Sequence, residues 1–281
     1  MKILGIGNAI VDVICKVNES FINDNSLIKG TMKLIFDDKE FKSILSNLKI
    51  EKTISGGSVA NSIVGLSQLG NEVGFIGKVS DDELGNKYEE GLKSENVKYF
   101  YEKKSEKLPT GTCLILVTPD SERTMCTFLG TAGKITEDDV DADIVNNSEI
   151  ILLEGYLWDE GEPKKAFDKA INNASKAAMS LSDQFCVDRH KPHFLDLVKN
   201  KLDIIFVNEQ EMLSLIDGKS FDDVLDFTKS LDKLFVITRG EKGAVLVFEN
   251  KITENGIENN LNIKDLTGAG DLFASGFLHG H

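Results

Sequence analysis

The second half of the chain alternates short apolar runs with amphipathic stretches, and this alternation limits the possible folds more than any other feature. Strands that alternate with helices form βαβ units, in which a mostly parallel sheet is covered by helices. We therefore expect an α/β fold with a mostly parallel central sheet flanked by helices. The expected strands are 149–155, 177–184, 203–209, 234–240 and 243–249. The expected helices are 162–176, 192–200, a stretch from 209, 220–231 and 268–279.

The first half continues this pattern in some places and departs from it in others. A core strand at 2–7, a helix at 56–70, a strand at 72–79 and a helix at 81–96 fit the α/β rhythm. Residues 11–17 and 32–36 instead look like strands with an exposed face, and 112–119 with 123–130 looks like a hairpin. We interpret these pieces as a small β-sheet that forms a lid. The expected division is 1–10, 41–98 and 130–281 for the α/β core domain, which carries the nucleotide and catalytic site, and 11–40 and 99–129 for the lid.

Charge and cysteine content exclude several classes of function. The 281 residues carry a net charge of −14, which disfavours binding to nucleic acid or to an anionic membrane. No apolar run reaches the length that spans a membrane, and the N-terminal segment fits a buried strand better than a signal peptide. The four cysteines are widely spaced and form no C-x-x-C pair, so we expect reduced thiols and a cytoplasmic location.

A small-residue turn near the C-terminus is the clearest candidate for a reaction centre. Residues 265–271 read DLTGAGD, and the expected last helix begins inside this segment. The unpaired N–H groups and the dipole of a helix N-terminus favour an anion, and glycine lets the backbone approach it. Asp271 would lie beside that anion, where a carboxylate can accept the proton of a hydroxyl that attacks phosphorus. The alternative is that Asp271 only favours the helix dipole and that Gly268, Ala269 and Gly270 only form a turn.

Two features in the N-terminal part suit a hydroxylated ligand. Gly56 and Gly57 precede a helix that carries Asn61 one turn later, although a plain strand–helix turn would read the same way. Asp12 is a single charge within an apolar strand, and a buried charge is costly unless it is paired or bound to a ligand. We therefore expect Asp12 to bind hydroxyl groups.

Two later segments lie where α/β sheets bind their ligands, outside the carboxyl ends of the strands. Asn208 and Glu211 follow one expected strand; Glu211 either reaches a magnesium-bound water or only stabilises the start of a helix. The segment 238–243 follows the next strand and forms either a nucleotide-facing loop or a tight turn. His190 and His193 flank Pro192 without a third ligand, so a solvated loop explains them better than a metal site.

The order and spacing of these motifs resemble those of the ribokinase-like (PfkB) carbohydrate and nucleoside kinases. The resemblance extends from Ile3 to Phe277 and is most specific in the D-x-T-G-A-G-D segment. Within the family the adenosine kinase branch is the most similar. Its motifs are matched by GNAIVD (7–12), GGSVANS (56–62), PTGTC (109–113) and the arginine that precedes the expected purine-contacting strand at 125–129.

The resemblance implies a role for each matched position. Asp271 is the general base on the 5′-hydroxyl, the amides of Gly268, Ala269 and Gly270 form the anion hole, and Arg123 moves toward the phosphates. The residues implied to hold the ribose are Asp12, Gly56, Gly57, Ser58 and Asn61. Those implied to surround the purine are Asn8, Ile10, Cys113, Met125, Leu129 and Phe185, with Tyr156 as a further candidate. Asn208 and Glu211 serve the Mg²⁺–phosphate network, with Glu211 acting through water. The ATP side is formed by Thr238, Gly240, Gly243, Asp265 and Thr267.

The resemblance thus implies a kinase that uses ATP and Mg²⁺, with a monovalent cation as a further candidate, to phosphorylate adenosine. The alternatives are a kinase of the same family that acts on another sugar or nucleoside (ribose, fructose or inosine), and a nucleoside-binding protein without catalysis. We expect a monomer or a homodimer formed through the lid. Family members continue beyond the last helix of this sequence, so we also expect part of the ATP pocket to lie in a longer chain.

Overall fold

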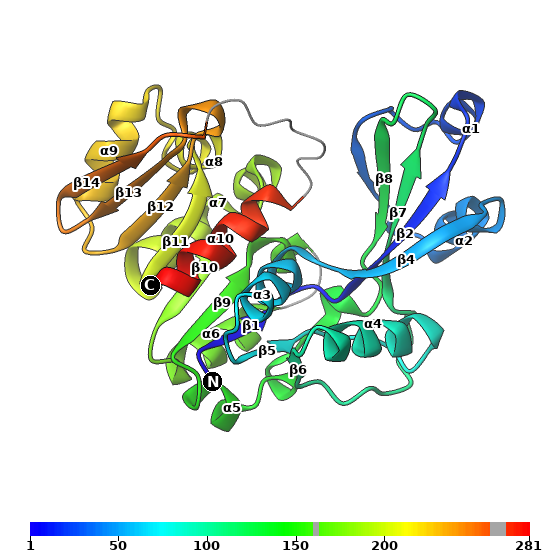
Figure 1. Ribbon diagram of the computed structural model, residues 1–281, viewed down its shortest axis with the longest axis horizontal. Helices are drawn as coiled ribbons and strands as arrows, with labels where there is room; N and C mark the ends of the chain where they lie inside the picture. Colours follow the sequence, from blue (N-terminus) through cyan, green and yellow to red (C-terminus); the bar gives the residue numbers. More distant parts are fainter. Residues whose placement is uncertain (160–162, 259–267) are drawn as a thin grey trace.

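The molecule consists of a large and a small β-sheet with helices packed against both (Figure 1). The structure is a computed structural model that describes residues 1–159, 163–258 and 268–281. Within these residues the larger sheet has nine strands in the order β14-β13-β12-β11-β10-β9-β1-β5-β6. All neighbours are parallel except the pairs β12–β13 and β13–β14, which are antiparallel. The predicted α/β fold with a mostly parallel central sheet is therefore confirmed.

The strands of the larger sheet are short, and the central ones, such as β1, β5 and β9, are buried, as expected when helices cover both faces. They are β1 (Ile3–Ile6), β5 (Val73–Ile76), β6 (Lys98–Tyr99), β9 (Ile150–Glu154), β10 (Ala177–Ser180), β11 (Ile204–Asn208), β12 (Leu234–Thr238), β13 (Ala244–Phe248) and β14 (Lys251–Asn255). The sequence pattern missed β14, whose residues are all exposed and which lies at the sheet edge with no apolar run to mark it.

Two hydrophobic cores lie on the two faces of this sheet. One face is covered by α3 (Ser58–Gln68), α4 (Glu83–Ser94) and α10 (Ala269–Gly280). The other is covered by α5 (Ala142–Asn146), α6 (Pro163–Asn173), α7 (Gln184–Asp196), α8 (Glu209–Ile216) and α9 (Phe221–Lys229). Short helical turns complete the connections: η1 (Ala132–Lys134), η2 (Glu137–Asp139), η3 (Gly155–Asp159), η4 (Leu197–Lys201) and η5 (Gly240–Lys242).

The helix α7 corrects the prediction of a loop around the two histidines. Asp183 caps its N-terminus by accepting a hydrogen bond from the Cys186 N–H at 2.6 Å, so the helix begins well before Pro192. Proline cannot donate the usual helical hydrogen bond. The helix therefore accommodates Pro192 with a local departure at His190, where φ is −117°.

The smaller sheet has five strands among the described residues, in the order β3-β8-β7-β2-β4. They are β2 (Ile10–Lys16), β3 (Met32–Leu34), β4 (Ile50–Gly56), β7 (Gly111–Val117) and β8 (Arg123–Phe128). β4 pairs with β2, although the division based on sequence assigned 41–98 to the core domain. The sequence pattern did not indicate β4 because only Ile50 and Ile54 among its residues are large apolar ones, and most of the strand is exposed or half-buried.

Among the described residues, helices cover only one face of the smaller sheet. α1 (Glu19–Asp24) and α2 (Asp38–Ser46) pack there, and the rings of Phe41 and Phe128 stack with their centroids 5.3 Å apart. The other face carries half-buried apolar side chains, such as Ile14 and Met125. As Figure 1 shows, this sheet projects from the larger body beside the N-terminal end of α10. No helix in the described part of the chain has the length and apolar character needed to cross a bilayer.

Candidate active site

The predicted catalytic turn lies where α10 packs against α3, and the two helices run side by side over the larger sheet (Figure 1). Gly65 on α3 allows this close packing, because a Cβ there would lie 2.7 Å from the Ser275 Oγ on α10. Gly268 precedes α10 with φ at 73°, a left-handed conformation that favours glycine. The turn thus needs glycine for its backbone conformation, as the sequence indicated.

Asp271 lies in the first turn of α10 and is held by α3. Its Oδ1 accepts a hydrogen bond from the Ser58 Oγ at 2.6 Å, and its Oδ2 accepts one from the Asn61 Nδ2 at 3.0 Å. The Ser62 Oγ also donates to the backbone oxygen of Asp271, at 3.0 Å. Burial raises the pKa of the Asp271 carboxyl, and the hydrogen bonds from Ser58 and Asn61 oppose that rise. The result is a fixed carboxylate beside the amides of a helix N-terminus, where an anion is favoured.

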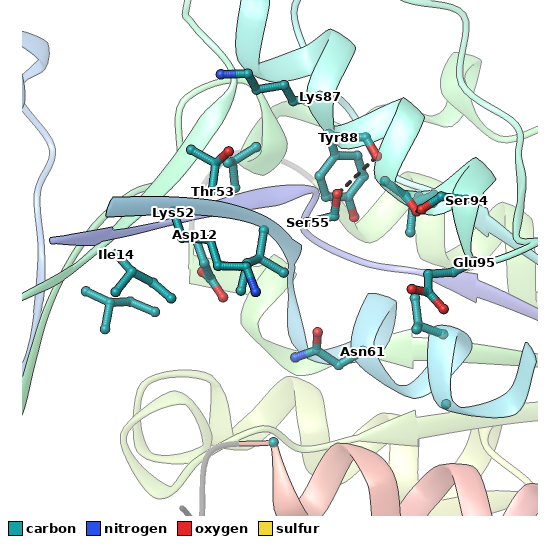
Figure 2. A pocket seen from close by; sticks show the side chains of 18 of the residues that line it. Asp12, Ile14, Lys52, Thr53, Ser55, Asn61, Lys87, Tyr88, Ser94 and Glu95 are labelled. Carbon is teal, nitrogen blue, oxygen red and sulfur yellow. Dashed lines mark hydrogen bonds between the residues drawn. The ribbon is translucent and has the colours of Figure 1, made fainter. Parts of the chain in front are cut away.

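A pocket of about 640 Å³ lies between the smaller sheet and α3. Its polar residues include Asp12 on β2, Asn61 on α3 and Arg123 on β8, and Gly268 lies at its edge. Apolar side chains, among them Ile14, Ile54, Ile115 and Leu272, complete the lining. Figure 2 shows that Asp12 and Asn61 come from different elements and border the same space. A lining that combines polar and apolar side chains suits a ligand that has both characters.

Asp12 is partly buried against Gly56, the last residue of β4, and Gly57 follows as the N-cap of α3. A Cβ on Gly56 would lie 2.6 Å from the Asp12 Oδ2, and a Cβ on Gly57 would lie 2.2 Å from the backbone oxygen of Asn8. Gly57 also has φ at 103°, which disfavours any other residue. Burial raises the pKa of Asp12 to about 6, and the positive charge of Arg123 opposes that rise.

A second pocket, of about 160 Å³, is lined by Asp271 itself. It brings together the predicted residues Ser58, Asn208, Glu211, Thr238, Gly270 and Asp271. Asn208 and Glu211 form a capping box at the start of α8: the Asn208 Oδ1 accepts from the Glu211 N–H at 2.8 Å, and the Glu211 Oε2 accepts from the Asn208 N–H at 3.0 Å. Burial raises the pKa of Glu211 to about 7. The capping role expected as the alternative for Glu211 is therefore present, within a pocket beside Asp271.

The residues predicted to surround a flat base fall into two groups. Ile10, Cys113 and Leu129 form one small buried cluster, with Met125 packed against it. Phe185 lies apart from them and is 72% exposed near the start of α7. None of these five residues is among those that line the two pockets. Tyr156 packs against the core of the larger sheet, and its hydroxyl lies 3.5 Å from the Ser182 backbone oxygen.

Only some of the residues predicted on the ATP side lie among the described residues. Gly240 begins the turn η5, and Gly243, with φ at 84°, follows it in the β12–β13 connection. Asp265 and Thr267 lie outside the described residues. Ala269 is the first residue of α10. No cluster of three or more metal-ligating side chains occurs among the described residues. Asn208 and Glu211 offer the oxygen ligands that Mg²⁺ prefers, directly or through water.

Sequence reasoning missed Glu154, the last residue of β9. Its side chain is buried, with 1% exposed, and accepts hydrogen bonds from Asn8 and from the N-terminus of α3. The signal was present in the sequence, since a lone carboxylate ends the apolar run IILLE. It resembled the acidic residues that commonly follow a strand, and only the packing showed that it is enclosed.

Comparisons with known proteins agree with this architecture. A family model described as pfkB family carbohydrate kinase matches residues 26–281. The solved structure of adenosine kinase from Sinorhizobium meliloti is 37% identical, with a TM-score of 0.89 over 99% of this chain and 86% of that chain. A probable sugar kinase from Rhizobium etli is 36% identical, with a TM-score of 0.88 over the same shares of the two chains. The 5-dehydro-2-deoxygluconokinase of Geobacillus kaustophilus is 26% identical over 244 residues, which are 80% of this chain and 72% of that protein.

The fold and these matches define a kinase of the ribokinase-like class. The chain belongs to the pfkB family of carbohydrate kinases. Kinases of this family take ATP and a sugar or nucleoside as substrates, so the predicted family and enzyme class are confirmed.

Proposed function

We propose that the protein transfers the γ-phosphoryl group of ATP to the 5′-hydroxyl of adenosine, with Asp271 as the general base. The observation that carries this proposal is that Asp271, whose carboxylate Ser58 and Asn61 hold, lines the smaller pocket, while Asn61, Gly268 and Leu272 beside it line the larger one. A base must lie within hydrogen-bond reach of the hydroxyl that it deprotonates. The larger pocket would place the acceptor on one side of Asp271, and the smaller pocket would place ATP on the other.

In the proposed reaction the acceptor oxygen attacks the γ-phosphorus, and a new O–P bond forms as the bond to the β-phosphate oxygen breaks. The acceptor proton passes to the Asp271 carboxylate, and ADP leaves with the electron pair of the broken bond. The first-turn amides of α10 would stabilise the charge on the transferred group. Asn208 and Glu211 would hold Mg²⁺, directly or through water, and the ion would supply positive charge to the phosphates.

Two observations favour a nucleoside as the acceptor. The larger pocket is lined by apolar side chains such as Ile14 and Ile115, which suit a flat base, as well as by the polar Asp12 and Asn61. In addition, the adenosine kinase of Sinorhizobium meliloti is 37% identical over almost the whole chain. A bare sugar would leave the apolar side chains of the lining without an apolar partner. The competing candidate is another sugar, and the similarity to 5-dehydro-2-deoxygluconokinase supports it.

Replacement of the base tests the mechanism. Asp271→Asn keeps the shape of the side chain but removes its ability to accept a proton, so kcat should fall at least ~10²-fold with the adenosine Kd little changed. Asp222→Asn is the matched control, because Asp222 is an exposed carboxylate in the first turn of α9. Near-normal turnover in Asp271→Asn would reject the assignment of the base.

Titration calorimetry and an ATP-consumption assay test the acceptor. We expect adenosine to bind and to stimulate ATP consumption, and ribose, fructose and 5-dehydro-2-deoxygluconate to do neither. Binding of a bare sugar without binding of adenosine would select the competing candidate. Adenosine binding without ATP consumption would instead indicate a nucleoside-binding protein that lacks catalysis.

A further inference from the structure

Glu154 is a buried carboxylate that touches neither pocket yet lies directly behind the site. The register of β1 and β9 pairs Ile6 with Leu153, so Gly7 and Glu154, which come next along the chain, lie next to each other. The Glu154 Oε1 accepts a hydrogen bond from the Asn8 Nδ2 at 2.9 Å, and its Oε2 accepts one from the Val59 N–H at 3.0 Å. Gly7 makes room for it, since a Cβ on Gly7 would lie 2.4 Å from the Glu154 Oε2.

These contacts fix the end of the helix that holds the base. Val59 is the second residue of α3, and the glycine that caps this helix offers no side chain to its N–H groups. A charged acceptor on an N–H of the first turn is a favourable partner for the positive end of a helix. The same end of α3 carries Ser58 and Asn61, which donate to the two oxygens of Asp271. A rigid path therefore runs from Glu154 through α3 to Asp271.

We propose that Glu154 is a positioning residue for the phosphoryl transfer: it anchors the N-terminus of α3 so that Ser58 and Asn61 hold Asp271 in its productive orientation. This inference rests on the proposed role of Asp271 as the base. Glu154 acts through α3 and contacts neither substrate. Without the contacts of Glu154, the N-terminus of α3 would shift and would move the Asp271 carboxylate with it. Small displacements in an active site lower the rate strongly.

The first pair of variants separates the anchor from the charge. Glu154→Ala removes both hydrogen bonds, and we expect kcat to fall roughly 10- to 100-fold while the Kd values for adenosine and ATP change less than about 3-fold. Glu154→Gln keeps an oxygen for the Val59 N–H. When the Asn8 amide turns over, the Gln amide can donate to the Asn8 Oδ1, which has no hydrogen-bond partner among the described residues. We therefore expect Glu154→Gln to keep kcat within about 3-fold of the wild type.

A second variant moves the carboxylate without changing its chemistry. In Gly7→Ala the new methyl group would displace Glu154, so kcat should fall in the same direction as in Glu154→Ala. Gly276→Ala is the matched control, because a Cβ at Gly276 on α10 meets nothing within 4 Å. Thr228→Ala is the control for general stability, since it removes a buried hydrogen bond on α9 and should lower Tm without lowering kcat.

A double-mutant comparison tests the path through α3. If Glu154 acts through Ser58, then Glu154→Ala should cost much less in a Ser58→Ala background than in the wild type. Two results would overturn the inference: equal losses in both backgrounds, or Glu154→Ala and Gly7→Ala variants that keep kcat within 2-fold. If Glu154→Ala fails to fold, Gly7→Ala and Glu154→Gln decide the matter by the same criteria. Asp271→Asn, assayed in parallel, separates the two ideas, because an active Asp271→Asn variant rejects the base itself and not only its anchor.

Discussion

The carboxylates of the two sheets differ in whether protein groups donate hydrogen bonds to them. In the larger sheet and its helices, Asp271, Glu154 and Glu211 each accept hydrogen bonds from protein groups. In the smaller sheet, Asp12 faces the larger pocket and its side chain accepts no hydrogen bond from the described residues. In the described part of the chain, helices cover both faces of the larger sheet but only one face of the smaller. The larger body thus holds its acids in fixed geometry, whereas the smaller sheet leaves an acid available to a ligand.

This difference predicts that the two regions affect different kinetic parameters, which mutation can test. Changes in the body should lower kcat, and changes in the smaller sheet should weaken binding of the acceptor. Beside the loss of at least ~10²-fold in kcat expected for Asp271→Asn, three smaller effects sharpen the contrast.

The largest of these is expected for Asp12→Asn. A hydrogen bond to a charged group contributes about 1.5–3 kcal/mol, so loss of the carboxylate should raise the acceptor KM roughly 10- to 100-fold. Turnover at saturating acceptor should stay within a few-fold of the wild type, because Asp12 does not contact Asp271. Steady-state kinetics with varied adenosine measures both values. A fall in kcat with an unchanged KM would show that the division between the sheets is wrong.

An intermediate effect is expected from pH. The pKa of Asp12 is raised to about 6, so the carboxylate is protonated as the pH falls below that value and loses an acceptor for ligand hydroxyls. The acceptor KM should therefore rise by up to ~10-fold per pH unit below about pH 6 and should be constant above pH 7. Asp12→Asn is the control, and its KM should not vary over this range. A wild-type KM that is flat from pH 5 to 7 would contradict the role of Asp12.

The smallest effect concerns the apolar side chains that line the larger pocket. Ile14→Ala removes apolar surface from the pocket lining, at about 0.8 kcal/mol per buried methylene, and should weaken adenosine binding roughly 3- to 10-fold. Ile50→Ala on β4 is the control, since Ile50 is 49% exposed and lies outside the pocket. Calorimetric titration with adenosine compares the two variants. Equal affinities would argue against a base that packs against Ile14.

Much of the fold could be predicted because its signals are local. Apolar runs marked the buried strands of the larger sheet, and the helices at 58–68 and 269–280 began at the glycines that the sequence indicated. The elements that were missed, β4 and β14, lack such runs, since their exposed residues carry no hydrophobic period. The short α1 and α2 were missed as well, and both cover only the smaller sheet.

The sequence alone determined the class of fold, the family and the glycine-rich turn before the last helix, because the period of apolar residues and the order of the small-residue motifs are written along the chain. Only the tertiary structure decided what holds Asp271. Ser58 and Asn61 bond Asp271 across 213 and 210 residues of sequence. These contacts depend on the close packing of α3 against α10 at Gly65, and the burial of Glu154 depends on the register of β1 and β9. Packing and strand register bring together segments that are far apart in the sequence. A local sequence pattern therefore cannot specify these contacts.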